Sequence, residues 1–141
     1  MQLLQPTVAE ELAFAALNLG RTAAEVEAAC ARWVEWFGLG PLLGSDPHAL
    51  SAGQQQVVLL AAALIASPRL LVADEPGAHL DRAARRRAIG AVRAELERGM
   101  GVVWATQDPD ELSAAHEALH QSSLNSERNN LVRIDLSAVF E

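Results

Sequence analysis

The sequence predicts an α/β protein, in which a helical subdomain is followed by a partial parallel β-sheet that helices cover. Three observations support this fold class. The first third of the chain has helical periodicity with helix-capping patterns, two later apolar runs are typical of buried strands, and a helical segment separates those runs. A strand, a helix and a second strand within about 35 residues form a βαβ unit, whose two strands are parallel.

The first predicted helix runs through VAEELAFAALNL. It follows a capping-box pattern, in which Thr7 precedes Glu10 by three residues. Such a pair satisfies backbone N–H groups that the first turn of a helix leaves without partners. Gly20 can end the helix, because glycine readily takes the left-handed conformation that helix ends use.

The second predicted helix begins with the same pattern, at Thr22 and Glu25, and ends at Gly38. The loop that follows, residues 38–48, is rich in Gly, Pro and Asp. Its glycines do not indicate a dinucleotide-binding loop, because a helix and not a strand precedes them. The apolar stripe of the helix consists of Val26, Ala29, Cys30, Trp33 and Phe37.

The remainder of the chain contains five further predicted elements. They are a helix from Ser51 to about Ala66, which Pro68 ends, a strand at 70–74, a helix at 84–99, a strand at 101–106, and a last strand in LVRIDL, residues 131–136. The apolar run 57–66 is about half as long as a membrane-spanning helix, so we expect no span. The start of the chain has no signal-peptide pattern.

Composition excludes several classes of protein. The 141 residues fit one domain and carry a net charge of −7, and all 11 positive side chains are arginines. An acidic chain with 4% aromatic residues lacks the basic surface and stacking groups of a nucleic-acid binder. The single cysteine, Cys30, allows no intrachain disulfide, which fits a reducing compartment; we interpret it as a small apolar residue of a helix.

Two short stretches carry the chemistry. Asp74 and Glu75 end the first predicted strand, and adjacent carboxylates at such a position typically serve a metal ion and a water molecule that attacks a phosphate. Ser51 can cap its helix, which leaves the N–H groups of Ala52 and Gly53 and the helix dipole as an anion site. The simpler alternatives are a strand that ends in solvated acids and an ordinary capped helix.

Four motifs in order resemble those of the nucleotide-binding subunits of ABC transporters. Residues 50–54, LSAGQ, resemble the LSGGQ signature, and Asp74 follows Ser51 by 23 positions, as the family pattern requires. Residues 78–81 resemble the D-loop, and Thr106-Gln107-Asp108 stands where the family has Thr-His-Asp. The opening segment, TVAEELAFAALNLG, is similar to cobalt, nickel and vitamin uptake ATPases, including the energy-coupling-factor type. The resemblance covers residues 1 to about 120.

The resemblance implies a partial P-loop NTPase (RecA-like) sheet and three regions. Residues 1–49 are the helical subdomain, 50–121 are the signature helix, Walker B strand, D-loop and switch strand, and 122–141 are a divergent tail. The implied cofactors are ATP and Mg²⁺, shared with a second ATPase subunit. The implied location is the cytoplasmic face of the membrane, against transmembrane transporter subunits. The implied roles are catalysis for Glu75 and Gln107, metal binding for Asp74, and nucleotide binding for Ser51, Ala52, Gly53, Gln54 and Asp81.

The sequence departs from the family in two respects. A Walker A loop requires a lysine, and the chain has none, so we expect a truncated subunit that neither binds ATP tightly nor hydrolyses it alone. The absent P-loop strand should leave an apolar sheet edge that favours association. Gln107 replaces the switch histidine, and an amide can hydrogen-bond a phosphate but cannot carry a proton.

Two other hypotheses about the function remain open. One is a non-catalytic, degenerate subunit or interaction protein, which the missing Walker A loop favours. The other is a zinc metallopeptidase, because His116-Glu117-Ala118-Leu119-His120 has the H-E-x-x-H pattern. A zinc site needs a third ligand, and none downstream has a recognisable pattern, so two surface histidines on a helix explain the motif more simply.

Overall fold

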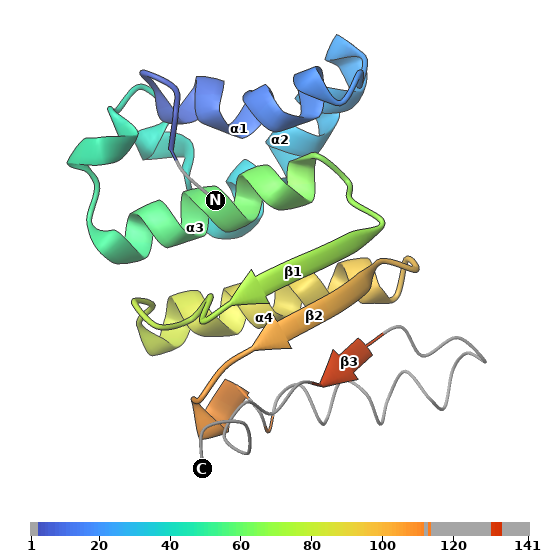
Figure 1. Cartoon of the computed structure of the whole chain (residues 1–141). Coiled ribbons are helices and arrows are strands. Elements are labelled where there is room, and N and C mark those ends of the chain that lie inside the picture. Colours follow the sequence, from blue (N-terminus) through green and yellow to red (C-terminus); the bar gives the residue numbers. More distant parts are fainter. Residues whose placement is uncertain (1–2, 112, 114–130, 134–141) are drawn as a thin grey trace. The chain divides into compact units, whose positions relative to one another are not determined.

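The computed structural model describes residues 3–111, 113 and 131–133 (Figure 1). Its elements are the helices α1 (Val8–Asn18), α2 (Ala23–Phe37), α3 (Ala52–Ile65) and α4 (Arg82–Leu96), the strands β1 (Leu70–Asp74), β2 (Gly101–Ala105) and β3 (Leu131–Arg133), and two short 3-10 helices, η1 (Gly40–Leu42) and η2 (Pro47–Ala49). The structure confirms the predicted α/β class, with a helical region followed by a small parallel sheet.

The chain forms two compact units. The helical unit comprises Met1–Pro68 and His79–Arg87, and the sheet unit comprises Arg69–Ala78 and Ala88–Glu141. Helix α4 therefore begins in the helical unit and ends in the sheet unit.

Local capping sets the start of α1 and both ends of α2. The Thr7 hydroxyl accepts a hydrogen bond from the Glu10 N–H, and the Glu10 carboxylate accepts one from the same hydroxyl at 2.6 Å. At α2 the full reciprocal box forms, because the Glu25 carboxylate also accepts the Thr22 N–H at 2.9 Å. Gly38 ends α2 at φ 68°, where a side chain would be strained. These contacts confirm the boundaries that the sequence predicts.

The core of the helical unit lies among α1, α2 and α3, which contact one another. Each of the first two helices buries one stripe of apolar side chains, whereas α3 is apolar nearly all round. Trp33 makes ring contacts with Trp36 and Phe37, at centroid separations of 6.1 and 5.9 Å. The largest fully buried residues of this core are Val8, Leu12, Trp33, Val58, Leu64 and Ile65.

The segment between α2 and α3, predicted as a loop, contains the 3-10 helices η1 and η2. Each has a proline in its first turn, which fixes φ and needs no hydrogen-bond acceptor there. The Asp46 carboxylate also accepts the His48 N–H at 2.8 Å. The N–H of Val8 donates to the carbonyl of Ser45 at 3.0 Å, so this segment is tied to the start of α1.

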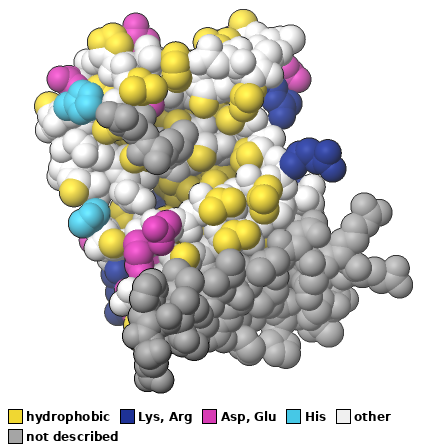
Figure 2. All heavy atoms as spheres, viewed as in Figure 1, with side chains coloured by type: hydrophobic (Ala, Val, Ile, Leu, Met, Phe, Trp, Pro, Cys, Tyr) yellow, Lys and Arg dark blue, Asp and Glu magenta, His cyan; other side chains and the backbone are white. Residues whose placement is uncertain are grey.

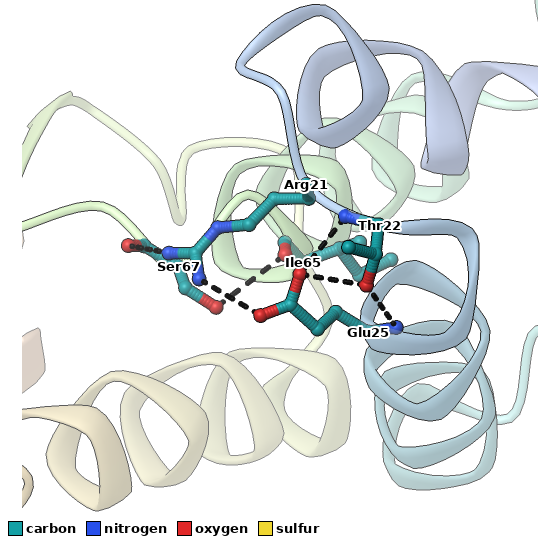
Figure 3. A network of polar contacts seen from close by, with 5 residues as sticks. All are labelled: Arg21, Thr22, Glu25, Ile65 and Ser67. Atoms are coloured by element: carbon teal, nitrogen blue, oxygen red, sulfur yellow. Dashed lines mark hydrogen bonds and ion pairs between the residues drawn. The ribbon is translucent and has the colours of Figure 1, made fainter.

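A polar network joins the α1–α2 turn to the end of α3 (Figure 3). The Arg21 guanidinium donates to the carbonyl of Ser67 at 3.2 Å and lies 4.0 Å from the Glu25 carboxylate. Ser67 has φ 50°, a conformation that non-glycine residues rarely adopt. Arg21 thus fixes the backbone immediately before Pro68, where the chain leaves the helical unit.

The sheet unit contains three parallel strands in the order β1-β2-β3. Leu71 and Val102 are register partners and are both buried, whereas Leu70 and Val72 on the other face of β1 are 56% and 68% exposed. The predicted βαβ crossover and its parallel strands are confirmed. Of the predicted strand 131–136, the first three residues form β3, and 134–136 lie outside the described residues.

Helix α4 starts two residues earlier than the predicted 84–99 and ends at Leu96. The Asp81 carboxylate accepts the Ala84 N–H at 2.7 Å, so it caps the first turn. Gly99, at φ 96°, and Met100 donate their N–H groups back to the carbonyls of Leu96 and Glu95. This closure, typical of helix ends with a left-handed glycine, explains why the helix stops short of 99.

Hydrophobic side chains also reach the surface at scattered positions (Figure 2). Within the part of the chain that the structure describes, no helix combines the length and apolar character needed to cross a bilayer.

Candidate functional site

The start of α3 carries the first group of predicted site residues. Ser51 is the cap: its hydroxyl accepts the Gln54 N–H at 3.3 Å, and the Gln54 side-chain oxygen accepts the Ser51 N–H at 3.0 Å. This capping box leaves the N–H groups of Ala52 and Gly53 without an acceptor among the described residues. These two N–H groups lie at the amino end of α3, which bears partial positive charge, so they can hydrogen-bond an anion there.

Gly53 lies against the backbone of His79 and the side chain of Leu80, both in the helical unit. A Cβ atom at position 53 would lie 2.6 Å from the carbonyl oxygen of His79, a distance that real Cβ atoms do not tolerate. The glycine is therefore needed for a contact within the chain, between the signature-like segment and the D-loop-like segment. Gly53 was predicted to bind nucleotide, and this packing role was not predicted.

Asp81 and Gln54 both have local structural partners. The Asp81 carboxylate caps α4 through the Ala84 N–H, and Gln54 completes the capping box of α3. The pattern Asp81-Arg82-Ala83-Ala84 is that of a helix N-cap, so sequence reasoning could have found the first role. The helical unit thus carries Ser51, Ala52, Gly53, Gln54 and Asp81.

The sheet unit carries the acid pair, Asp74 and Glu75, and the switch segment, residues 106–108. Asp74 is the last residue of β1 and is exposed, and Glu75 follows it. The Glu75 carboxylate accepts the Gln107 N–H at 3.0 Å and the Thr106 hydroxyl at 3.4 Å. Because β1 and β2 are parallel, their carboxyl ends meet at one edge of the sheet, which brings Glu75 to Thr106 and Gln107.

The backbone at Glu75 is unusual. Its φ of 45° lies in the left-handed region, and its N–H donates to the Ala105 carbonyl at 2.8 Å, one residue beyond the paired strand β1. Bulky residues adopt this conformation only where surrounding contacts hold them, and such residues are concentrated at functional sites. The two hydrogen bonds of the carboxylate supply such contacts.

The switch segment is held by its own side chains. The Thr106 hydroxyl accepts the Asp108 N–H at 3.1 Å, and the Asp108 carboxylate accepts the N–H groups of Asp110 and Glu111. Gln107 contributes only its backbone, and its side chain is exposed. Gln107 was a predicted site residue, whereas the cap at Asp108 was not predicted. The order Asp-Pro-Asp-Glu, with proline at the first helical position, could have indicated that cap.

The H-E-x-x-H motif at His116, Glu117 and His120 lies outside the described residues. Across 3–111, 113 and 131–133, no group of three or more His, Cys, Asp or Glu side chains is placed to hold a metal ion. Asp74 by itself offers two carboxylate oxygens that accept no hydrogen bond from the described residues, which is a donor type that Mg²⁺ prefers.

Cys30 in α2 is half-buried, as expected for a helix residue that contributes to packing. Burial raises the pKa of its thiol above the ordinary value, which disfavours the reactive thiolate. It has no place in the candidate site.

Comparison with known proteins identifies the class to which this fold and these motifs belong. The family model described as ABC transporter matches residues 2–78, which include the signature-like segment, β1 and the acid pair. The chain belongs to the ABC transporter family, as the resemblance in its motifs implied.

Similar curated proteins are named as ATP-binding proteins of transporters, and two of them as proteins of metal import. The chain is 40% identical, over 115 residues, to the energy-coupling factor transporter ATP-binding protein EcfA1 of Symbiobacterium thermophilum, an alignment that covers 81% of this chain and 40% of that protein. It is 47% identical over 81 residues to the nickel import ATP-binding protein NikO of Rhodobacter capsulatus, covering 57% and 32%. It is 33% identical over 111 residues to the cobalt import ATP-binding protein CbiO of Syntrophus aciditrophicus, covering 79% and 40%.

Solved structures confirm the P-loop NTPase type of fold. An ATP-binding subunit of an ABC transporter matches with a TM-score of 0.73 and 28% identity, over 80% of this chain and 47% of that one. The dimeric structure of a bacterial ABC transporter cassette matches with a TM-score of 0.69 and 25% identity, over 79% and 51%. The chain thus spans about 40% of the length of EcfA1 and CbiO and about half of these structures.

Proposed function

We propose that the chain corresponds to the C-terminal portion of an importer-type ABC ATP-binding subunit and supplies the signature half of a shared nucleotide site. The observation that supports this most directly is the start of α3. There the Ser51–Gln54 capping box leaves the N–H groups of Ala52 and Gly53 open to an anion. In this proposal they contact the γ-phosphate of ATP that a second ATPase subunit holds, with the Ser51 hydroxyl as a further donor.

The acid pair has a separate role in the proposal. In a nucleotide site completed by a Walker A loop, Asp74, whose oxygens are open, would hold Mg²⁺ through bound water, and the ion would neutralise charge on the phosphates. Glu75 is the base that polarises the attacking water. Since its carboxylate accepts hydrogen bonds from Thr106 and Gln107, one on each oxygen, we infer that these bonds pre-position the base, and each oxygen keeps a lone pair for the water.

The partners follow from the family. The second ATPase subunit can be another copy or a related chain, and the assembled pair sits on the cytoplasmic face of the membrane against transmembrane subunits. Residues 1–141 contain no lysine and hence no Walker A motif. We therefore propose that the pure chain neither binds ATP tightly nor hydrolyses it.

A binding experiment tests this proposal. The chain is mixed with full-length EcfA1 of S. thermophilum, and hetero-association is measured by sedimentation velocity with and without MgATP. We expect association that requires MgATP, and a loss of about tenfold in affinity for Ser51→Ala. The control is Ser45→Ala, because Ser45 hydrogen-bonds through its backbone, from its N–H to Leu42 and from the Val8 N–H to its carbonyl. Association of equal affinity with and without MgATP would contradict the proposal, and so would a Ser51→Ala chain that associates as tightly as the unmodified chain.

The second candidate is a non-catalytic subunit, which Gln107 favours because its amide cannot carry a proton. The same mixture separates the two candidates. ATP turnover by a complex in which this chain contributes Glu75, lost on Glu75→Gln, supports the catalytic role. Nucleotide-dependent pairing with turnover unchanged by Glu75→Gln supports the non-catalytic one.

A further inference from the structure

One side chain in the first turn of α3 holds the segment that leads into the helix. The Gln55 side-chain N–H₂ group lies 3.1 Å from the carbonyl oxygen of Pro47, 3.4 Å from that of His48 and 3.2 Å from that of Leu50. An amide has two N–H donors, so at most two of these three contacts can each have a proton of their own. All three acceptors belong to the five residues that precede Ala52.

The segment 47–50 has few other constraints. Pro47 is fully buried, and the Asp46 carboxylate caps η2 through the His48 N–H. The remaining backbone bonds are turn contacts of 3.0 and 3.3 Å, from Ala49 to Asp46 and from Leu50 to Pro47. Beyond η2, Leu50 and Ser51 are extended, with ψ near 155°. Three carbonyl groups of an otherwise short turn thus share a single side-chain donor.

We propose that Gln55 is a positioning residue for the start of α3. By binding the carbonyls of Pro47 and Leu50 it fixes the direction in which the chain enters the helix, so that the Ser51 hydroxyl faces the Gln54 N–H and the N–H groups of Ala52 and Gly53 remain open. The structural part of this inference concerns the chain alone. Its consequence for nucleotide-dependent pairing rests on the proposed function.

The chemistry of the contact predicts which substitutions are tolerated. Only donors are used, because all three partners are carbonyl oxygens. A lysine ammonium has three donors and no acceptor, whereas a glutamate has the shape of glutamine but only acceptors, which repel carbonyl oxygens. Gln55→Lys should therefore preserve the turn, and Gln55→Glu and Gln55→Met should release it.

Gln56 supplies a matched control. It is the next residue of the same helix, it is also half-buried, and the structure gives its side chain no hydrogen bond among the described residues. Gln56→Glu introduces the same charge one position away without removing a donor from the 47–50 segment.

The first measurement is amide hydrogen exchange on the free chain. For Gln55→Glu and Gln55→Met we expect exchange at Ala49, Leu50 and Ser51 to accelerate by about tenfold, with exchange at Leu12 in α1 unchanged. Gln55→Lys and Gln56→Glu should stay within about threefold of the unmodified chain. If Gln55→Glu does not fold, the exchange rates of Gln55→Lys and Gln55→Met still test the proposal. Lysine and methionine variants that exchange alike would overturn the proposal.

The second measurement is MgATP-dependent association with EcfA1. We expect Gln55→Met to weaken association by about fivefold to tenfold, and Gln55→Lys to associate as tightly as the unmodified chain. If the unmodified chain does not associate at all, the proposed function fails, while the exchange experiment still tests the role of Gln55. If exchange follows the donor rule but association does not, Gln55 organises the turn without affecting the nucleotide surface, and that part of the proposal is overturned.

Discussion

Glu75 and Gln107 are joined by a hydrogen bond of 3.0 Å from the Gln107 N–H to the Glu75 carboxylate, across 32 positions of sequence. The bond connects the residue after β1 to the segment after β2, and it uses the backbone of Gln107. A change of the side chain at 107 therefore leaves the contact in place. This separates the chemistry of the switch position from the structural anchoring of Glu75.

The strained backbone at Glu75 leads to a stability prediction. Glu75→Ala removes both hydrogen bonds and retains a Cβ at φ 45°, whereas Glu75→Gly removes the same bonds and relieves the strain. We expect Glu75→Gly to be about 1 kcal/mol more stable than Glu75→Ala in urea unfolding. Gln107→Ala should change stability by less than about 0.5 kcal/mol. An alanine variant as stable as the glycine variant would show that Glu75 is not strained.

A side chain at position 53 should disrupt the helical unit. Gly53→Ala places a Cβ 2.6 Å from the His79 carbonyl oxygen, and relieving that overlap requires a backbone shift. We expect a loss of about 1–3 kcal/mol in urea unfolding. The control is Gly44→Ala, since an added Cβ there has no neighbour within 4 Å. Equal stability of the two variants would mean that the backbone of residues 79–81 can shift away from position 53 with little loss of stability.

Buried Glu11 anchors the segment that precedes α1. It is 4% exposed, and one of its carboxylate oxygens accepts the N–H groups of Leu4 and Gln5 at 2.7 and 2.8 Å. Glu11→Ala leaves both donors without a partner and should cost about 2 kcal/mol, whereas Glu11→Gln retains an acceptor and should cost less. Exposed Glu27, in α2, provides the control, and its change to alanine should cost under about 0.5 kcal/mol. We also expect faster proteolysis near residue 5 in Glu11→Ala, because the segment before α1 is then no longer held by the carboxylate.

The capping box of α2 predicts a pH dependence. Hydrogen bonds from the Thr22 N–H and hydroxyl, aided by the Arg21 charge, lower the pKa of Glu25 from its usual 4.5. A folded-state pKa below the unfolded one means that the stabilisation is fully present above about pH 4.5 and is lost as pH falls through the folded value. The stability difference between the unmodified chain and Glu25→Gln should therefore shrink on acidification, and shrink less in a Thr22→Ala background. A difference that is the same at neutral and acid pH would contradict this.

The parts of the fold that depend on local chemistry could be predicted from sequence. Thr22 with Glu25, Ser51 with Gln54, and Gly38 each set a helix end through partners at most four residues away, so pattern reasoning places them correctly. The parallel strands follow from the length of the segment between two apolar runs. The η1 and η2 turns were not predicted, because glycine and proline content indicates a loop without specifying its conformation.

The contacts that complete the candidate site could not be predicted in this way. Glu75 reaches Gln107 only because the two strands have a particular register, and Gly53 meets His79 only because the D-loop-like segment returns to α3. A single sequence carries no signal for such long-range contacts. Gln55 is intermediate: its partners are only five to eight residues away, but they lie in a turn whose shape the sequence does not reveal.

The indole groups provide each unit with its own optical reporter. Trp33 and Trp36 lie in the helical unit, where one is buried and the other donates to the Arg87 carbonyl at 3.0 Å. Trp104 lies in β2, and its N–H donates to the Glu111 carboxylate at 2.8 Å. Replacing Trp104 with phenylalanine leaves an emission signal from the helical unit alone, and the complementary double replacement isolates the sheet unit. Loss of native fluorescence can then be followed separately in the two units.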